Sequence, residues 1–182
     1  YGNILKGVND KRWRLEHAQV INENDFEMFG KYSIIPSIQP THATSDMLWA
    51  ILRLGKNRIR NGYAYKTLLE QNGMVALGTD FPIEGINPIH TFFAAVARKN
   101  LNGEPKNGFQ KENSLTRIEA LKGMTIWAAI ANFEEKDKGS LEKGKYADFT
   151  ILSNNLLEIP EDEILSTKVI STYLNGELVY GN

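Results

Sequence analysis

The stretch Met74-Val-Ala-Leu-Gly-Thr-Asp80-Phe-Pro82 gives the strongest indication of the fold. Its first part, Met74–Gly78, is a short, continuous apolar run, which is typical of a strand covered on both faces in a parallel sheet. A carboxylate, Asp80, follows as soon as the run ends. The stretch therefore predicts one strand of an α/β sheet with a chemically useful side chain at its carboxyl end.

Two more β-compatible runs precede this strand, and helical patterns separate them. The runs are Trp13–Val20 and Tyr32–Gln39, and the polar stretch Asn22–Lys31 between them has room for one helix. Asp46–Leu54 and Tyr63–Glu70 carry apolar residues at helical spacing. Because strands joined by short crossovers usually lie side by side, the three runs are predicted to be parallel neighbours in chain order.

Helical patterns continue after the third strand. His90–Arg98 predicts one helix, and the Gly-, Asn- and Lys-rich segment Leu101–Asn113 predicts an exposed loop. Thr116 and Glu119 have the spacing of a capping box, which predicts the start of a further helix. The apolar face of that helix would consist of Ile118, Leu121, Ile126, Ala129 and Ile130.

The last part of the chain has a different pattern. Tyr146–Leu152 predicts a strand, and Lys168–Leu174 and Glu177–Tyr180 flank the dipeptide Asn175-Gly176. Asn-Gly is a strong hairpin signal because both central residues of a type I′ turn need a positive φ. We therefore divide the chain into an α/β unit, residues 1–135, and a small β module, residues 136–182.

Composition excludes several classes of function. The formal net charge of -1 gives no electrostatic case for a nucleic-acid partner or an anionic membrane surface. Every long apolar stretch is interrupted by charge or glycine before bilayer length, so no membrane span is predicted. The 182 residues contain no cysteine, which excludes disulfides and thiolate ligands and leaves His, Asp and Glu as the strong metal ligands.

Ligand-capable side chains occur at the end of each predicted strand. His17 lies late in the first strand, Gln39 and His42 follow the second, and Asp80 follows the third. The carboxyl ends of parallel strands meet at one edge of a sheet, so these groups are expected at the same end. Histidine and aspartate suit a divalent ion, and an aspartate beside an activated water can also take its proton.

These residues also have ordinary structural interpretations. A single histidine in an apolar strand is more often a hydrogen-bonded core residue than a ligand, and Asp80 before Phe-Pro can cap a turn. Glu84 is interpreted as a loop carboxylate, and His90 as a residue at a helix start. Two good ligands are fewer than a divalent site needs, and three β/α units do not close a barrel. The missing ligands and the missing β/α units both lead us to expect that the chain is part of a larger protein.

Five long motifs carry a family resemblance. They are Arg14-Leu-Glu-His17-Ala-Gln-Val-Ile21, Ile35-Pro-Ser-Ile-Gln39-Pro-Thr-His42-Ala-Thr-Ser-Asp46-Met47, Ala76-Leu-Gly-Thr-Asp80-Phe-Pro-Ile-Glu84, Leu115-Thr-Arg-Ile-Glu-Ala-Leu-Lys-Gly-Met-Thr-Ile-Trp-Ala-Ala129 and Gly139-Ser-Leu-Glu-Lys-Gly-Lys-Tyr-Ala-Asp148-Phe149. In this order they resemble the YtcJ-like, or amidohydrolase-3, group of the amidohydrolase superfamily. The resemblance covers nearly the whole chain.

The resemblance implies a distorted (β/α)₈, or TIM, barrel followed by a small β domain assembled from both chain ends. This chain would supply about strands six to eight and part of the β domain. The family hydrolyses amide or related C–N bonds, other than peptide bonds, with one or two divalent ions, usually zinc, that activate the attacking water.

The resemblance also implies roles for single residues. By position, His17 is similar to the metal-ligand histidine of the sixth strand, and Asp80 to the eighth-strand aspartate that binds metal and acts as general base. His42 is similar to a substrate-facing residue that polarises a carbonyl, and Gln39 is grouped with it as substrate-binding. Asp148, which leads into a strand, is interpreted as structural.

Other parts of the family's site have no counterpart in the sequence. No two histidines have the His-x-His spacing of the first strand, and the bridging Lys or Glu and the fifth-strand histidine are not found. The leading interpretation is the C-terminal part of a hydrolase that acts on a small amide-type substrate. The isolated chain is expected to be inactive and to hold divalent metal weakly or not at all. The alternatives are one subunit of a split hydrolase and a non-catalytic binding module on the same scaffold.

The absence of the other barrel strands predicts self-association. Strands without their barrel neighbours expose backbone groups and interior apolar side chains, and Ile35, Ile38, Val75 and Leu77 are the side chains expected to be exposed. We therefore expect a homo-oligomer, with a closed dimer as the simplest form.

Overall fold

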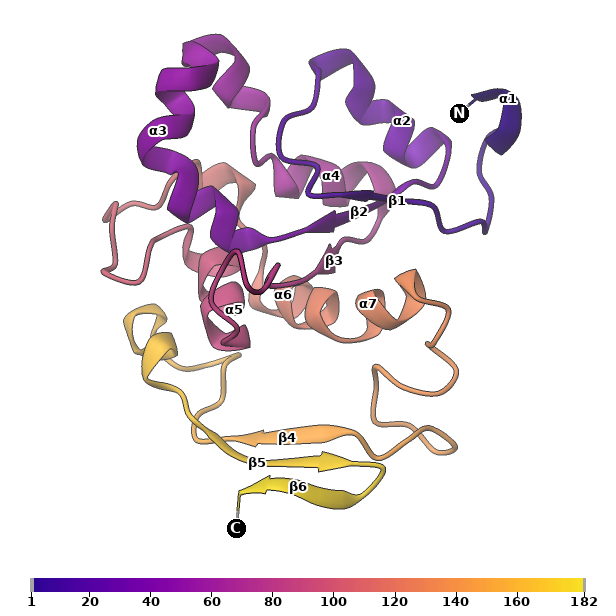
Figure 1. The fold of residues 1–182 in the computed structure, drawn as a ribbon, viewed down its shortest axis with the longest axis vertical. Helices are drawn as coiled ribbons and strands as arrows, with labels where there is room; N and C mark the ends of the chain where they lie inside the picture. The colour runs from indigo at the N-terminus through magenta and orange to yellow at the C-terminus, as the bar shows by residue number, and fades with distance from the viewer. Residues whose placement is uncertain (1, 182) are drawn as a thin grey trace.

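The computed structural model describes residues 2–181 and contains two three-stranded sheets. One sheet is parallel and has the order β1-β2-β3, formed by Arg14–Glu16, Ile35–Ile38 and Ala76–Leu77. The other is antiparallel and has the order β4-β5-β6, formed by Phe149–Leu152, Val169–Leu174 and Glu177–Gly181. A layer of helices lies between the two sheets (Figure 1).

Seven α-helices lie in the described part of the chain. They are α1 (Gly2–Leu5), α2 (Phe26–Lys31), α3 (Pro40–Arg58), α4 (Tyr65–Asn72), α5 (Pro88–Ala97), α6 (Arg117–Met124) and α7 (Ile126–Ala131). Short 3₁₀ turns complete the connections, namely η1 (Glu23–Asp25), η2 (Ile59–Asn61), η3 (Lys111–Asn113) and η4 (Glu161–Ser166). Within residues 2–181 no helix combines the length and the apolar character needed to cross a bilayer.

The parallel sheet has the predicted strand order, and its register aligns the strand ends. Glu16 pairs with Ser37, and Ser37 pairs with Ala76. The first strand is shorter than predicted, because it ends at Glu16 and His17 follows with a φ of 67°. A positive φ is incompatible with the pleat of a strand, so His17 lies just beyond β1 rather than within it.

Two helices differ from their predicted bounds. The helix predicted from Asp46 begins at Pro40, directly after β2, because proline is well suited to the first helical position. The helix predicted after Leu115 does begin with the capping box of Thr116 and Glu119, but it divides into α6 and α7 at Thr125, whose φ and ψ of -127° and -97° are not helical. The new start of α3 places His42 in its first turn.

The apolar strand residues are buried, contrary to the prediction that they would be exposed. Ile38, Val75 and Leu77 belong to the main core, and Ile35 belongs to a smaller cluster with Ala76 and Ala131. The reason is that helices pack on the sheet, with α4 against β2 and α6 and α7 against β3. In the parallel sheet, Leu15 on the edge strand β1 is left 40% exposed.

The C-terminal residues form the predicted hairpin. Asn175 and Gly176 have φ values of 49° and 82°, as the turn between β5 and β6 requires. The sheet is not wholly separate from the rest of the chain, because Leu156 and Ile164 join the main core and η4 packs on α5. The proposed division at residue 135 therefore stays a prediction about domains, with part of the second segment packed on the first.

Candidate metal and catalytic site

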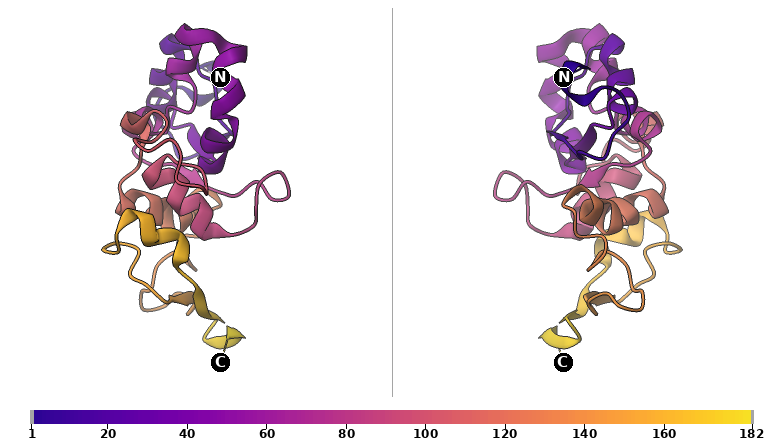
Figure 2. Two further views of the ribbon diagram at one scale, coloured as in Figure 1. Left: turned by 90° about the vertical axis from the view of Figure 1, so that its left-hand side faces the viewer. Right: turned by 90° about the vertical axis from the view of Figure 1, so that its right-hand side faces the viewer.

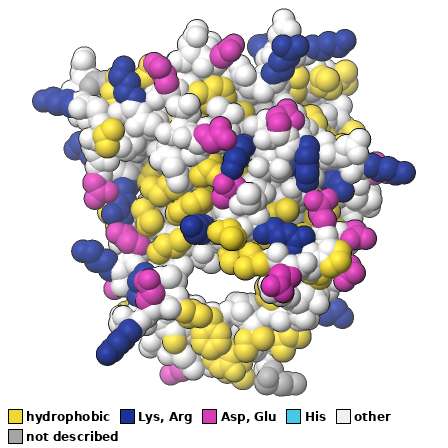
Figure 3. Space-filling model, turned by 180° about the vertical axis from the view of Figure 1, so that it is seen from behind, with side chains coloured by type: hydrophobic (Ala, Val, Ile, Leu, Met, Phe, Trp, Pro, Cys, Tyr) yellow, Lys and Arg dark blue, Asp and Glu magenta, His cyan; other side chains and the backbone are white. Residues whose placement is uncertain are grey.

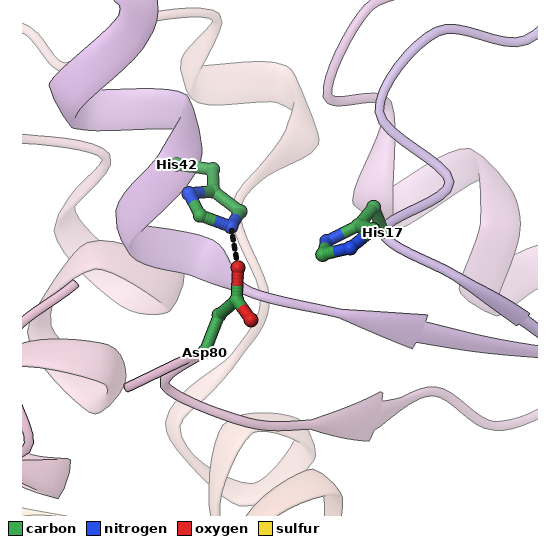
Figure 4. A group of neighbouring side chains, drawn as sticks. All are labelled: His17, His42 and Asp80. Atoms are coloured by element: carbon green, nitrogen blue, oxygen red, sulfur yellow. Dashed lines mark hydrogen bonds and ion pairs between the residues drawn. The ribbon is translucent and has the colours of Figure 1, made fainter. Parts of the chain in front are cut away.

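Three side chains that the sequence pointed to converge at the carboxyl end of the parallel sheet. His17 follows β1, His42 lies in the first turn of α3, and Asp80 follows β3. One donor atom from each lies within 4.8 Å of those of the other two (Figure 4). The His17 and His42 rings are 5.7 Å apart between centroids. This arrangement is a group of two imidazoles and one carboxylate, a donor set that suits zinc.

Unusual backbone conformations turn two of these side chains toward each other. His17 and Asp80 have φ values of 67° and 58°, in the left-handed region that non-glycine residues rarely occupy. Such strain tends to collect at functional sites, where the surrounding structure holds it in place. The carbonyl of Asp80 accepts hydrogen bonds from the amides of Ile83 and Glu84. Asp80 therefore does form a turn, but through its backbone, which leaves the carboxylate available for the site.

A hydrogen-bond chain fixes the ring of His17. Nδ1 of His17 lies 2.9 Å from Oε1 of Gln39, and Nε2 of Gln39 donates to Oε1 of Glu16 at 2.7 Å. Because the amide oxygen of Gln39 can only accept, Nδ1 of His17 carries the proton, and its Nε2 keeps a lone pair. Ser37 donates to the same Glu16 oxygen at 2.7 Å. Nε2 of His17 is thus left with a lone pair that could bind a metal ion.

His42 lies between two carboxylates. Its Nε2 is 3.1 Å from Oδ2 of Asp80, and its Nδ1 is 3.0 Å from Oε1 of Glu84. The histidine is 6% exposed, whereas the side chains of Asp80 and Glu84 are 30% and 18% exposed. Ser45 donates to the same Glu84 oxygen at 2.6 Å. The loop between β3 and α5, which carries Asp80 and Glu84, stands out from the body of the molecule (Figure 2).

A buried arginine, Arg98, packs against a tyrosine that is hydrogen-bonded to the backbone of Gln39. The hydroxyl of Tyr65 donates to the carbonyl of Gln39 at 3.1 Å, and the guanidinium of Arg98 lies 5.2 Å from the centre of the Tyr65 ring. Arg98 also donates from Nε to the carbonyl of Phe109 at 2.9 Å. Burial lowers the pKa of Arg98 to about 10, so the group remains charged near neutral pH. Burial likewise raises the pKa of Tyr65, which keeps its hydroxyl as a donor.

The structure brings all four predicted site residues together, and it adds two carboxylates. His17, His42 and Asp80 face one another, while the amide of Gln39 is engaged by His17 and Glu16. The substrate-binding role of Gln39 stays a prediction, because its position here is that of a support. Sequence reasoning missed Glu16 and treated Glu84 as a loop carboxylate. A site role for Glu84 could have been suspected from the sequence, because Glu84 follows Asp80 by only four residues.

Two cavities lie near the parallel sheet. A groove of about 900 Å³ runs along β1 and η1–α2, with Leu15, Val20, Phe29 and Ile34 among its lining residues. Its lining residues flank His17 in the sequence but do not include His17, His42 or Asp80. A smaller cavity of about 320 Å³ is lined by Thr41, Ser45, Glu84 and His90, among others, and so adjoins the site on the Glu84 side.

Comparisons with known proteins show which family the chain resembles. The sequence profile of the amidohydrolase family matches residues 3–180. The chain is 35% identical over 175 residues to the protein LONG AFTER FAR-RED 3 of Arabidopsis thaliana, a match that covers 96% of this chain and 30% of that protein. It is 33% identical over 172 residues to the putative amidohydrolase YtcJ of Bacillus subtilis, covering 94% and 32% of the two chains. The chain spans about a third of the length of these relatives.

A solved structure resembles most of the chain. It is an uncharacterized metal-dependent hydrolase from Pyrococcus horikoshii, with a TM-score of 0.71 and 30% sequence identity. The match covers 81% of this chain and 30% of that protein. The α/β fold described above is therefore similar to one part of a larger metal-dependent hydrolase, and the predicted resemblance to YtcJ-like proteins is confirmed.

Proposed function

This chain belongs to the amidohydrolase family, and we propose that it forms the last three β/α units of a (β/α)₈ barrel that hydrolyses an amide-type C–N bond. The observation that carries the proposal is the convergence of His17, His42 and Asp80 at the carboxyl end of the parallel sheet. In barrels of this kind the reacting groups gather at that end of the strands.

The side chains present fit a divalent metal, with zinc the ion we expect. His17 and Asp80 are the proposed ligands, and Nε2 of His42 lies within reach of the same position. A bound zinc ion would supply Lewis-acid activation of water and of the substrate carbonyl. The protein must hold the ligands in place, and Gln39 and Glu16 do so for His17 through the chain of hydrogen bonds described above.

Asp80 and His42 have complementary roles in the proposed reaction. Asp80 takes a proton from the attacking water, because it supplies the one carboxylate among the three converging groups. His42 hydrogen-bonds Oδ2 of Asp80 and so fixes the direction of that carboxylate. After the C–N bond breaks, the proton passes to the leaving nitrogen. His42 also faces the position where a substrate carbonyl would be polarised, as the family resemblance implies.

The remaining strands and ligands must come from outside this chain. The described sheet has three strands, and the two proposed ligands, His17 and Asp80, are one fewer than the three protein ligands typical of a catalytic zinc site. The matched relatives are about three times as long as this chain. We therefore propose that the site is completed by preceding strands, either of the same polypeptide or of a partner polypeptide.

A reconstitution experiment tests the proposal. A polypeptide that contains this chain and the preceding strands is loaded with zinc and assayed against a panel of N-acyl amines. Hydrolysis that a chelator abolishes and zinc restores is the expected result. The 182-residue chain alone should hold well below one zinc per chain after dialysis and should not turn over. A stoichiometric, chelator-resistant zinc in the isolated chain would contradict the idea that ligands are missing.

The same panel distinguishes the alternatives. If turnover appears only when a separately expressed partner with a His-x-His strand is added, the protein is a split hydrolase. If the complete assembly binds the N-acyl amines without hydrolysing them, it is a binding module. That last result would overturn the proposed function.

A further inference from the structure

Gln39 contacts both histidines of the candidate site. Its Oε1 lies 2.9 Å from Nδ1 of His17, and its Nε2 donates to Glu16 at 2.7 Å. Its backbone carbonyl accepts a hydrogen bond from the amide N–H of His42 at 3.0 Å. Gln39 is 4% exposed, so little water competes for these contacts. A shift of this one residue would therefore move both histidines.

The parallel sheet does not fix the carbonyl of Gln39. The pairing of β2 with β3 ends at Ile38, whose carbonyl accepts a hydrogen bond from the amide of Gly78. Gln39 is the N-cap of α3, but its side chain makes no capping hydrogen bond and contacts His17 instead. A carbonyl oxygen has two lone pairs, and the amide of His42 uses one of them. The second lone pair can accept from a donor on a different element.

Tyr65, on α4, supplies that second hydrogen bond, from its hydroxyl to the carbonyl of Gln39 at 3.1 Å. Tyr65 is completely buried, and two neighbours hold its ring. The guanidinium of Arg98 lies 5.2 Å from the ring centre, and the ring of Tyr63 meets it edge-on at 6.4 Å. Arg98 is itself fixed, because its Nε donates to the carbonyl of Phe109 at 2.9 Å. A ring enclosed in this way holds its hydroxyl at one position.

We propose that Tyr65 is a positioning residue, which holds the carbonyl of Gln39 in place for the candidate site. Through Gln39 it fixes both His17 and His42. The inference rests on the proposed function only for its effect on metal binding and rate. Loss of a group that holds a metal ligand from behind changes metal affinity or activity by about 10- to 100-fold. Tyr65 lies one residue further back, so a smaller change, roughly 3- to 10-fold, is expected from its single hydrogen bond.

Tyr65→Phe removes only the hydroxyl, and Tyr63→Phe is the matched control. Tyr63 is also buried, and its hydroxyl donates at 2.8 Å to Asp46, which lies further along α3. Two NMR signals of Gln39 are followed in the 182-residue chain labelled with ¹³C and ¹⁵N. In Tyr65→Phe the carbonyl ¹³C signal should move upfield, and the side-chain NH₂ should exchange with water roughly 3- to 10-fold faster. Tyr63→Phe should leave both signals of Gln39 unchanged.

The exchange of the Gln39 side chain decides the positioning role. Unchanged exchange in Tyr65→Phe, or an equal increase in both variants, would overturn the proposal, because a hydroxyl that only stabilises the core affects both variants alike. Thermal melting shows whether the variants fold. If Tyr65→Phe does not fold, wild-type chain with ¹³Cζ-labelled tyrosine is measured in equal parts H₂O and D₂O. Two resolved Cζ signals for Tyr65 mean a slowly exchanging, bonded hydroxyl and support the proposal, whereas one averaged signal refutes it.

The consequence for the site is tested in the complete polypeptide, which contains this chain and the preceding strands. Tyr65→Phe should raise the zinc Kd, measured by competition with a chelator, and lower kcat, each roughly 3- to 10-fold with little change in KM. Tyr63→Phe should change neither quantity. A wild-type zinc Kd and kcat in Tyr65→Phe would contradict the positioning role. If the wild-type polypeptide hydrolyses none of the N-acyl amines, the proposed function fails, and the signals of Gln39 still decide the role of Tyr65.

Discussion

The two sheets of this molecule differ in how completely they are covered. In the parallel sheet, Ile35, Ile38 and Val75 are at most 1% exposed, because helices of the same chain pack against the strands. In the antiparallel sheet every residue of β6 is exposed, and large apolar side chains such as Val179 and Tyr180 face solvent. Hydrophobic side chains gather over the β module, and a hollow separates it from the body above (Figure 3).

This difference shows where most of the core lies. The parallel sheet and its helices supply most of the main core, to which Leu156 and Ile164 of the C-terminal segment are added, and the candidate site lies at an edge of that core. The β module leaves apolar surface uncovered, which costs roughly 25 cal/mol for each Å² kept in water. Such a surface is expected to pack against something else, and in the family resemblance it does so against segments from the other chain end.

The largest expected effect is on kcat. It is expected for an aspartate beside the parallel sheet, Asp80, and not for one in the β module, Asp148. Asp80→Asn in the complete enzyme should lower kcat by about 10²- to 10⁴-fold, because an amide neither accepts the proton nor binds metal well. Asp148→Asn should leave kcat unchanged, because Asp148 accepts a hydrogen bond from the amide of Asn175 and an asparagine oxygen can do the same. Steady-state kinetics with thermal melting as a folding control make the comparison. An Asp80→Asn enzyme that retains most of its kcat would remove Asp80 from the mechanism.

A second comparison concerns stability. Phe92 on α5 is fully buried, so Phe92→Ala should reduce the free energy of unfolding by about 3–5 kcal/mol. Val179 on β6 is largely exposed, and Val179→Ala should change that free energy by less than about 0.5 kcal/mol. Urea unfolding followed by circular dichroism measures both. Similar losses in the two variants would mean that the β module contributes to the core as much as the parallel unit does.

Self-association should depend more on the β module than on the parallel sheet. The isolated chain should dimerise at micromolar concentration, measured by light scattering. Val179→Lys should weaken the dimer about tenfold, which corresponds to about 1.4 kcal/mol. Leu15→Lys, at the edge strand β1, should weaken it less, because Leu15 is 40% exposed and Val179 is 58% exposed. A soluble, cooperatively folded monomer would refute this prediction for both regions.

The smallest effect concerns the segment before β1, which an ion pair attaches to the residues after α7. Arg12 donates to both carboxylate oxygens of Glu135, at 2.8 and 2.9 Å, and these hydrogen bonds lower the pKa of Glu135 from 4.5 to about 2. A lowered carboxyl pKa stabilises the fold above pH 4.5, and this stabilisation is lost as the pH falls from 4.5 to about 2.

The matched variant Glu135→Gln isolates that contribution. Urea midpoints of the wild type should fall across this pH range by slightly more than those of Glu135→Gln. The difference should shrink with added salt, because the pair lies at the surface. Parallel pH profiles for the two proteins would show that the Arg12 and Glu135 pair contributes nothing measurable.

Local patterns were sufficient wherever one short segment sets its own conformation. The capping box of Thr116 and Glu119 and the turn at Asn175-Gly176 formed as predicted, because each depends on hydrogen bonds or φ values within a few residues. The parallel order of the three strands was also predictable, because short connections leave few other arrangements. The wrong predictions concern contacts between segments far apart in the sequence. Ile35, for example, was predicted to be exposed but is buried in a cluster with Ala131 of α7.

The sequence by itself indicated that ligand-capable residues would lie at the ends of three parallel strands, and that their chemistry would suit a divalent metal. It did so because strand period and residue type are local properties. Only the tertiary structure decided how those residues meet. It placed His42 in the first turn of α3, gave His17 and Asp80 left-handed backbone conformations beside it, and brought Glu84 into contact with His42. Such distances and orientations depend on the packing of elements far apart in the chain, and no local pattern encodes them.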